Sequence, residues 1–257
     1  MLLTTPTFWR DRLRASGIHL GLSLVIALAA ALLVFGIWYP YPYREISGGR
    51  ELFLLVVTVD VILGPLITLA VFNRAKPWTE LRRDLVIAVL LQLAALAYGL
   101  WPVSVARPVH MVFEIDRFRV VHGVDIPNEL LERTPPGVQA LPLTGPTLLA
   151  VRPFRDDNES MNATLAALQG VSLSARPDLW QSYADAVPRI LQVARPVSTL
   201  KTRYPDRAAE IERIVTAAGR KPETALYLPL TGRNVFWTVF LDPANASVIG
   251  TMPLDSF

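Results

Sequence analysis

The sequence predicts an integral membrane protein: three transmembrane helices near the N-terminus, followed by an α+β domain built on an antiparallel sheet. The 257 residues are 52% hydrophobic with a mean hydropathy of +0.36, which is too apolar for one ordinary soluble domain. Three long apolar runs precede residue 102, and about 20 apolar residues suffice to cross a hydrocarbon core of roughly 30 Å. Residues 102–257 have the composition and length of one globular domain.

Residues 1–17 form a short basic segment ahead of the first apolar run, which covers residues 18–38. That run is longer than the 7–15 residues typical of a signal peptide, and it ends in a cluster of aromatic residues and prolines that begins at Trp38. Aromatic side chains of this kind mark a membrane interface. We therefore expect a retained first transmembrane helix.

The second run, residues 52–72, carries one acid, Asp60, near its middle. An aspartate at the centre of a transmembrane helix costs about 2.5–3.5 kcal/mol on insertion scales, so a neighbour must offset it. Pro65 cannot donate to the carbonyl of Val61, and Gly64 removes a side chain beside it, which predicts a kink or opening there. This patch is either a site for a partner helix, an ion or a proton, or a structural contact within the bundle.

The third run, residues 85–101, places Gln92 at nearly the same depth as Asp60. A hydrogen bond between these two side chains is therefore predicted, although such bonds are worth only about 0.6–2 kcal/mol in membranes. A further partner or protonation of Asp60 is needed to cover the cost of burial. His19 and Ser23 are expected to lie too close to the cytoplasmic end of the first helix to serve as that partner.

Basic residues in the short loops predict the orientation. Two of them, Arg44 and Arg50, lie between the first and second runs. The other seven lie in the N-terminal segment and the second loop: Arg10, Arg12, Arg14, Arg74, Lys76, Arg82 and Arg83. The excess places the N-terminus and the second loop in the cytoplasm. Residues 102–257 then lie outside the inner membrane, in the periplasm of a Gram-negative cell.

The predicted periplasmic domain begins with a β-hairpin over residues 109–121, with Asp116-Arg117 as its turn. The C-terminal strands are expected to form an antiparallel meander that pairs with this hairpin, with helices on one side of the sheet. Pro188 is expected to end the helix predicted at residues 177–187, with an extension over residues 189–194 as the alternative. Helices are predicted at residues 128–133, 156–169, 177–187, 198–204 and 206–218, and further strands at 147–151, 225–230, 235–241 and 246–252.

Composition and motifs exclude several kinds of chemistry. The chain has no cysteine, which removes disulfides, thiolate catalysis and cysteine-ligated metals. Residues 102–257 carry 16 basic and 16 acidic side chains, which does not support nucleic-acid binding. We find no phosphate-binding loop and no hydrolase or zinc-protease motif. His110 and His122 flank the hairpin and are expected to face each other across it, but they lack further metal ligands, so we expect no metal site. Because these motifs are absent, we also expect no cofactor and no catalytic residue.

The first half of the chain resembles the type IV pilin accessory proteins of the TfpX/TfpZ family, which are bacterial inner-membrane proteins. The resemblance covers roughly residues 16–121. Its motifs are Gly17-Ile18-His19-Leu20, Trp38-Tyr39-Pro40, Val59-Asp60, Leu63-Gly64-Pro65-Leu66, Val71-Phe72-Asn73, Gln92-Leu93-Ala94-Ala95-Leu96-Ala97-Tyr98-Gly99 and Arg107-Pro108-Val109 leading into residues 113–121.

This resemblance implies a non-enzymatic role in the stability, assembly or regulation of type IV pilins, with a pilin as the partner. Before assembly, a pilin lies in the inner membrane with an apolar helix in the bilayer and a soluble head outside it. The polar patch in the transmembrane helices could therefore contact the pilin helix, and the periplasmic domain could contact the head. The expected contact residues are Asp60, Gly64, Pro65 and Gln92.

Two other classes stay open. An ion-coupled or proton-coupled membrane component would use Asp60 as a carrier, and it would need a second ionisable group at mid-membrane, which the prediction lacks. A membrane-tethered periplasmic sensor would bind a ligand in the α+β domain. Such a sensor normally needs a cytoplasmic output module, and the cytoplasmic segments are short.

Overall fold

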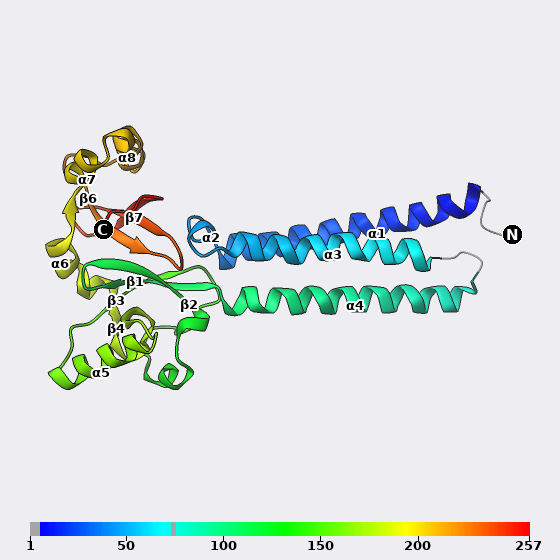
Figure 1. The fold of residues 1–257 in the computed structure, drawn as a ribbon, viewed down its shortest axis with the longest axis horizontal. Coiled ribbons are helices and arrows are strands. Elements are labelled where there is room, and N and C mark those ends of the chain that lie inside the picture. Colours follow the sequence, from blue (N-terminus) through cyan, green and yellow to red (C-terminus); the bar gives the residue numbers. More distant parts are fainter. Residues whose placement is uncertain (1–5, 73–75) are drawn as a thin grey trace. The chain divides into compact units, whose positions relative to one another are not determined.

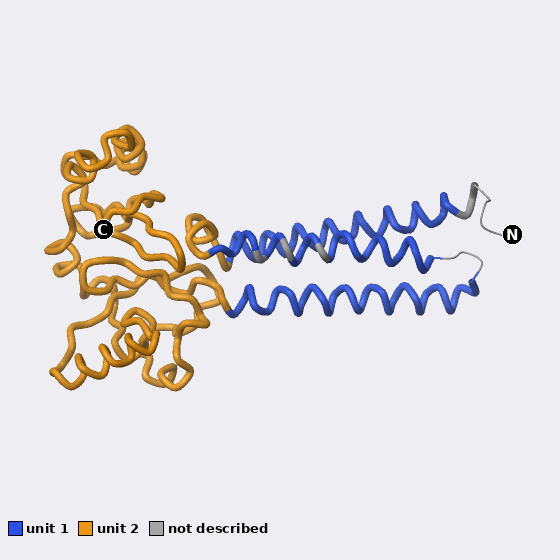
Figure 2. The backbone as a smooth tube through the Cα atoms, in the orientation of Figure 1, with its two compact units in different colours: residues 1–37, 48–105 blue, residues 38–47, 106–257 orange. Residues whose placement is uncertain are grey.

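The computed structural model describes residues 6–72 and 76–257. The chain divides into two compact units, which Figure 2 distinguishes by colour. Unit 1 holds residues 1–37 and 48–105, and unit 2 holds residues 38–47 and 106–257. Arg74, which contributed to the predicted orientation, lies outside the described residues.

Unit 1 consists of three long helices that lie side by side (Figure 1). They are α1 (Pro6–Leu32), which continues as π-helix over Leu33–Trp38, α3 (Gly49–Val71) and α4 (Trp78–Val105). Among the described residues, three stretches are long and apolar enough to cross a membrane: Trp9–Trp38, Gly49–Val71 and Trp78–Val105. Each helix begins before the apolar run that predicted it, most of all α1, because polar and charged residues at a helix end can still adopt helical geometry.

Helix α3 packs against both α1 and α4. Its helical geometry continues through Pro65, so the predicted opening of the helix there is wrong. A proline removes only one backbone hydrogen bond, and neighbouring helices hold the chain on both sides of it. Gly99 of α4 lies against Val56 of α3, where an added Cβ would come within 2.5 Å of a valine methyl group. Glycine therefore permits close approach of the two helices.

Unit 2 is built on one eight-stranded sheet with the order β4-β3-β1-β2-β6-β7-β8, and β5 pairs with β6. Five of its pairings are antiparallel, but β1 pairs with β3 and β2 with β6 in parallel, so the sheet is mixed and the predicted antiparallel sheet is wrong. The strands are β1 (Pro108–Glu114), β2 (Arg117–His122), β3 (Thr147–Val151), β4 (Trp180–Ser182), β5 (Arg195–Pro196), β6 (Leu226–Thr231), β7 (Phe236–Leu241) and β8 (Val248–Met252).

The hairpin and the C-terminal meander confirm the predicted strands, with shifts of one or two residues at their ends. Glu114 pairs with Arg117, so the turn is Ile115-Asp116, one residue earlier than predicted. Ile115 adopts a φ of 55°, a left-handed conformation in which a branched residue is uncommon. The meander β6-β7-β8 does adjoin the hairpin, but the long helical crossover between β2 and β6 brings the two strands together in parallel.

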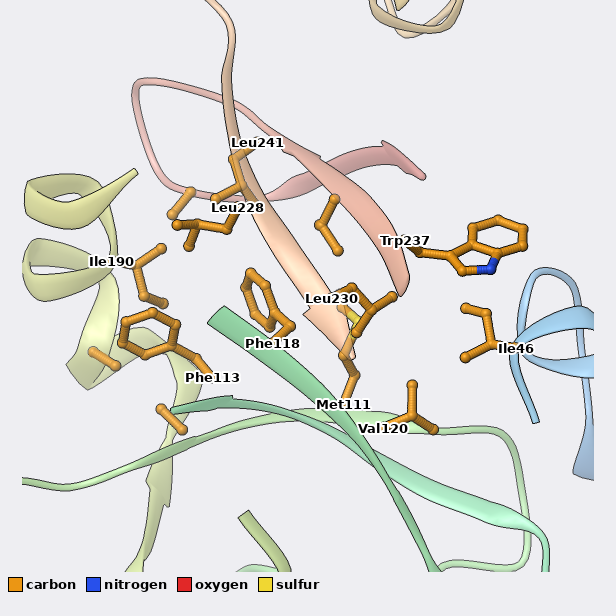
Figure 3. Close-up of a cluster of buried hydrophobic side chains, with 14 residues drawn as sticks. Ile46, Met111, Phe113, Phe118, Val120, Ile190, Leu228, Leu230, Trp237 and Leu241 are labelled. Atoms are coloured by element: carbon orange, nitrogen blue, oxygen red, sulfur yellow. The ribbon is translucent and has the colours of Figure 1, made fainter. Parts of the chain in front are cut away.

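Helices cover both faces of the sheet, not one face. One face packs against α6 (Tyr183–Val193) and against Ile46 of α2 (Tyr43–Ile46), as Figure 3 shows for Phe113, Ile190 and Trp237. The other face packs against α5 (Asp157–Leu168) beside β1 and β3, and against α7 (Val197–Arg203) and α8 (Ala208–Ala217) beside β6, β7 and β8. Short 3₁₀ turns lie at Gly123–Asp125, Asn128–Arg133, Leu173–Ala175, Pro177–Leu179 and Pro205–Arg207.

The segment around Pro188 differs from its prediction. A single helix was expected over residues 177–187, yet Trp180–Ser182 is strand β4, and α6 begins after it and runs through Pro188. Trp180 is 2% exposed, and its indole N–H donates to the carbonyl of Ser174 over 2.8 Å. Burial of this side chain and pairing of β4 with β3 outweigh the local helical pattern.

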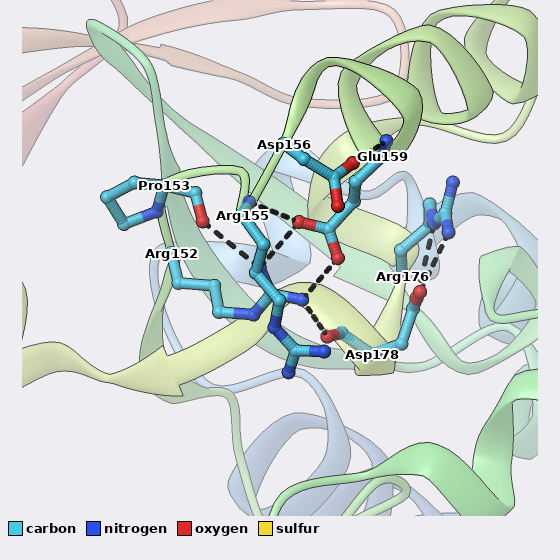
Figure 4. A network of polar contacts seen from close by, with 7 residues as sticks. All are labelled: Arg152, Pro153, Arg155, Asp156, Glu159, Arg176 and Asp178. Atoms are coloured by element: carbon cyan, nitrogen blue, oxygen red, sulfur yellow. Dashed lines mark hydrogen bonds and ion pairs between the residues drawn. The ribbon is translucent and has the colours of Figure 1, made fainter.

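A charged network fixes the start of α5 (Figure 4). Arg152 donates two hydrogen bonds to the carboxylate of Glu159 over 2.7 and 2.8 Å, and the backbone N–H of Arg155 donates a third over 2.7 Å. These bonds, those from Arg152 first, lower the pKa of Glu159 from its ordinary 4.5 to about 2. The side chain of Asp156 caps the helix by accepting from the backbone N–H of Glu159.

This network predicts an acid-sensitive contribution to stability. Because the folded pKa of Glu159 lies below its unfolded value, its contribution is complete above pH 4.5 and is lost as the pH falls toward 2. Glu159→Gln should therefore lower the unfolding temperature of the full chain in detergent at pH 6. It should also make the unfolding temperatures at pH 6 and pH 3 more similar than they are in the parent chain. Glu223→Gln, at an exposed turn, is the control. If the unfolding temperature of the Glu159→Gln chain depends on pH as that of the parent chain does, Glu159 is not the source of the acid sensitivity.

Candidate functional site

A buried polar cluster lies between the three apolar helices of unit 1. Asp60 and Thr68 of α3 are 8% and 3% exposed, and Ser23 of α1 is 1% exposed. Asp60, Gly64 and Thr68 recur every fourth residue, so they lie along one face of α3. Polar groups in an apolar environment are costly unless they are paired, and the cluster pairs them with one another.

Gln92 of α4 is the centre of this cluster. Its amide nitrogen donates to Asp60 Oδ2 over 3.3 Å and to Ser23 Oγ over 2.9 Å. The predicted hydrogen bond between Asp60 and Gln92 is therefore confirmed. One amide thus joins side chains from all three helices.

His19 completes the network, contrary to the prediction that excluded it. Its Nε2 lies 2.5 Å from Gln92 Oε1, and its Nδ1 lies 2.5 Å from Thr68 Oγ1. Since the amide oxygen only accepts, Nε2 of His19 is the donor in the first contact. The exclusion of His19 and Ser23 was wrong because it counted depth from Ile18, whereas α1 begins at Pro6 and places both residues further along the helix.

Gly64 and Pro65 are also part of the internal packing. A Cβ at Gly64 would lie 2.5 Å from Gln92 Oε1, so the absent side chain makes room for the central amide. The carbonyl of Pro65 accepts a hydrogen bond of 2.9 Å from Ser16 Oγ. Close approach at Gly64 is thus used by α4 of the same chain.

Asp60 nevertheless lines a groove of about 220 Å³ between α3 and α4, which we call the mid-helix groove. Its rim combines the large apolar side chains of Leu63 and Ile67 with the small side chains of Ala88 and Ala95. Small residues let a further helix approach closely in a membrane. The groove is lined by His19, Asp60, Leu63, Gly64, Ile67, Ala88, Leu91, Gln92 and Ala95.

A larger cavity of about 680 Å³ extends from His19 toward the start of α1 and the start of α4. Apolar side chains, among them Leu22 and Val89, line most of it, while Asp11, Arg14 and Lys76 lie at its other end. His19 therefore borders both the polar cluster and a cavity with charged groups.

The residues that sequence reasoning missed are Ser16, His19, Ser23 and Thr68. Ser16, His19 and Ser23 are spaced by three and four residues, which places them on one face of α1. This periodicity was available in the sequence. The apolar run begins only after Ser16, so this polar face extends across the start of the run.

The two histidines of the hairpin do not face each other. His110 pairs across the hairpin with Val121, and its Nε2 donates to the carbonyl of Ala140 over 3.0 Å. Burial lowers the pKa of His110 to about 4, although the bond to Ala140 opposes that shift, so it is neutral near pH 7. His122 contacts Asp125 instead. Within the described ranges, no group of three or more His, Asp or Glu residues could hold a metal ion.

Comparison with known proteins finds relatives along almost the whole chain. A family profile described as "Fimbrial assembly protein FimB" matches residues 7–48. The chain is 34% identical over 246 residues to the fimbrial assembly protein of serogroup E1 from Dichelobacter nodosus, and 35% identical over 247 residues to that of serogroup I. Both alignments cover 95% of this chain and 95% of the relative.

A third relative, the fimbrial assembly protein of serogroups C1 and C2 from the same organism, is 41% identical over 122 residues, covering 48% of this chain and 91% of the relative. No solved structure matches. The relatives are fimbrial proteins, in line with the resemblance seen in the sequence, whereas the narrower TfpX/TfpZ assignment stays a prediction.

Proposed function

Because the chain belongs to the fimbrial assembly protein family, we propose that it is a non-catalytic accessory factor that binds a type IV pilin in the bacterial inner membrane during fimbrial assembly. Its three apolar helices span the membrane, with the N-terminus in the cytoplasm and residues 102–257 in the periplasm. The membrane helices engage the apolar helix of the pilin, and the α+β unit faces its soluble head.

The observation that carries this proposal is the mid-helix groove with a carboxylate in its wall. Asp60 donates nothing when ionised, and among the described residues its carboxylate accepts one side-chain hydrogen bond, from Gln92. A carboxylate has room for about four hydrogen bonds, so Asp60 retains acceptor capacity toward the groove. A helix carrying a positive or hydrogen-donating group would supply the additional partner that a mid-membrane acid needs.

The groove also suits a helix in shape. Ala88 and Ala95 are one heptad apart on α4, so their small side chains lie on the same face of the helix. Leu63 and Ile67 form the opposite wall from α3. We therefore propose that the pilin helix packs between these walls, with the positively charged N-terminus of the mature pilin as the group that meets Asp60.

A filled groove tests this proposal. Ala95→Phe places a large side chain in the mid-helix groove and should lower the amount of pilin that co-purifies with the chain from detergent-solubilised membranes by about tenfold. Ala94→Phe is the matched control, because Ala94 is exposed and does not line the groove. Equal pilin recovery with the two variants would refute binding in this groove.

A second candidate function has one observation in its favour. The polar cluster joins two ionisable groups, Asp60 and His19, through Gln92, and His19 borders the cavity that contains Arg14 and Lys76. This arrangement suits a proton-coupled component, for which the sequence lacked a second group at mid-membrane. For a proton-coupled component, His19→Gln would abolish fimbrial assembly while the amount of co-purified pilin stayed unchanged. If the chain acts by binding pilin through Asp60, assembly and pilin recovery should change together.

A further inference from the structure

Unit 2 contains a polar pocket of about 410 Å³ on the sheet face that carries α5. We call it the arginine pocket, after Arg119 of β2 and Arg233 of the turn between β6 and β7. Arg119 is the register partner of Thr231, so the parallel pairing of β2 with β6 brings these two arginines to one place. The opposite wall comes from Gly170, Ser172 and Ala175 after α5.

Both guanidinium groups keep donors to spare. Arg119 uses its Nε in a 2.9 Å bond to Glu114, and Arg233 reaches Asp125 only at 3.4 Å. The Arg119 and Arg233 side chains are 34% and 46% exposed. Arginine has five N–H donors in a planar fork, so most of them are available to a ligand in the pocket.

His122 adds an unpaired group to the same wall. It is 2% exposed, and its Nδ1 lies 2.9 Å from Asp125 Oδ2, which fixes Nδ1 as the donor. Its Nε2 is buried and has no hydrogen-bond partner within the described part of the chain. An unsatisfied buried polar atom is costly, so a ligand that pairs with Nε2 is favoured. Nδ1–H points at the Asp125 carboxylate, so Nε2 donates to a ligand oxygen when the ring is the imidazolium partner of Asp125, with a proton on both nitrogens.

We propose that the arginine pocket binds a phosphate group. Arg119, Arg233 and His122 offer three donor groups from one wall of the pocket, which suits the several acceptor oxygens and the higher charge of a phosphate better than the two oxygens of a carboxylate. The volume greatly exceeds the roughly 30 Å³ that one water occupies, which leaves room for an organic group on the phosphate. Asp125 and Glu114 orient His122 and Arg119.

The phosphate has two sources, an anionic phospholipid headgroup or a free phosphate. Segments that support the pocket within unit 2 are joined along the chain to the apolar helices. The backbone N–H of Gly123 donates to the carbonyl of Arg107, two residues after α4 ends, and Gly232 lies against Ile46 in the connection between α1 and α3. Both sources offer the same phosphate oxygens to the arginine pocket, and the test distinguishes them.

The test uses the full chain in a nonionic detergent with ¹⁵N-labelled histidine. The chain has three histidines, so the His122 signal is assigned by its loss in His122→Gln. The probes are inorganic phosphate, dihexanoylphosphatidylglycerol and acetate. We expect the His122 signal to shift saturably with a phosphate probe, while acetate requires a concentration at least about tenfold higher. Saturation by inorganic phosphate identifies free phosphate as sufficient, and saturation by the lipid alone identifies the headgroup.

Two variants tie the signal to the pocket. Arg233→Gln should raise the midpoint of the phosphate titration by about tenfold, and Arg233→Lys, which keeps the charge without the fork, should raise it less. Arg213→Gln, on the exposed side of α8, should leave the midpoint unchanged. The His110 signal reports whether each variant is folded. The proposal is overturned if neither phosphate probe gives a saturable shift, if acetate acts at the same concentration, or if Arg233→Gln binds like the parent chain.

Discussion

Asp60→Asn is expected to reduce the pilin that co-purifies with the full chain by tenfold or more. The substitution keeps the size and shape of the side chain and its ability to accept from Gln92, which lies 3.3 Å away, so the helices should stay packed. It removes the negative charge that we propose meets the pilin. A hydrogen bond to a charged group contributes about 1.5–3 kcal/mol, and 1.4 kcal/mol corresponds to a factor of ten in binding.

The comparison for Asp60→Asn is Asp84→Asn, since Asp84 is a carboxylate of α4 that pairs with Lys76 outside the mid-helix groove. Both variants should accumulate in membranes at the parental level. If Asp60→Asn recovers as much pilin as Asp84→Asn does, the charge of Asp60 has no part in pilin binding, and the polar cluster is structural.

Gln92→Leu should destabilise the three-helix unit by about 2 kcal/mol. The substitution keeps a side chain of similar size but removes contacts to Asp60, Ser23 and His19. Hydrogen bonds between membrane helices average about 0.6 kcal/mol, and three of them are lost together. The loss should be larger if Asp60 stays ionised, because a buried acid is then left without its partner.

The effect of Gln92→Leu is measured as a change in the unfolding temperature of the full chain in detergent. A spectroscopic probe placed within the helices monitors the unfolding. Leu90→Ala, at a position of α4 that is 60% exposed, controls for a general effect of substitution on that helix. A Gln92→Leu chain as stable as the Leu90→Ala chain would show that the amide does not hold the helices together.

Local patterns in the sequence predicted most elements of unit 2 but not the way the sheet is assembled. The β-branched and aromatic residues of β1 and β2, the cap at Asp156 and the meander of β6, β7 and β8 are short-range signals, and the structure confirms each of these elements. The parallel pairs are set by crossovers of many residues. β-branched and aromatic residues favour a strand whether its neighbour is parallel or antiparallel, so the local sequence could not reveal the parallel pairs.

Depth in the membrane predicted one contact of the polar cluster and misplaced the rest. Asp60 and Gln92 lie near the middles of two well-bounded apolar runs, so their pairing followed from length alone. The first helix begins with charged residues that belong to the helix but not to the apolar run, so its middle was placed too far toward the C-terminus. His19 and Ser23 were excluded by that displacement. Partners across a bundle depend on helix phase and offset as well as on hydropathy.

Photo-crosslinking from the mid-helix groove is the most direct test of pilin binding. A photoreactive residue at Leu63, which is 51% exposed and lines the groove, would be compared with one at Leu66, which is 53% exposed and does not. In cells that produce their native pilins, we predict a pilin adduct from position 63 and little or none from position 66. Equal capture from both positions, or capture from position 63 of α4 of the same chain alone, would contradict the account.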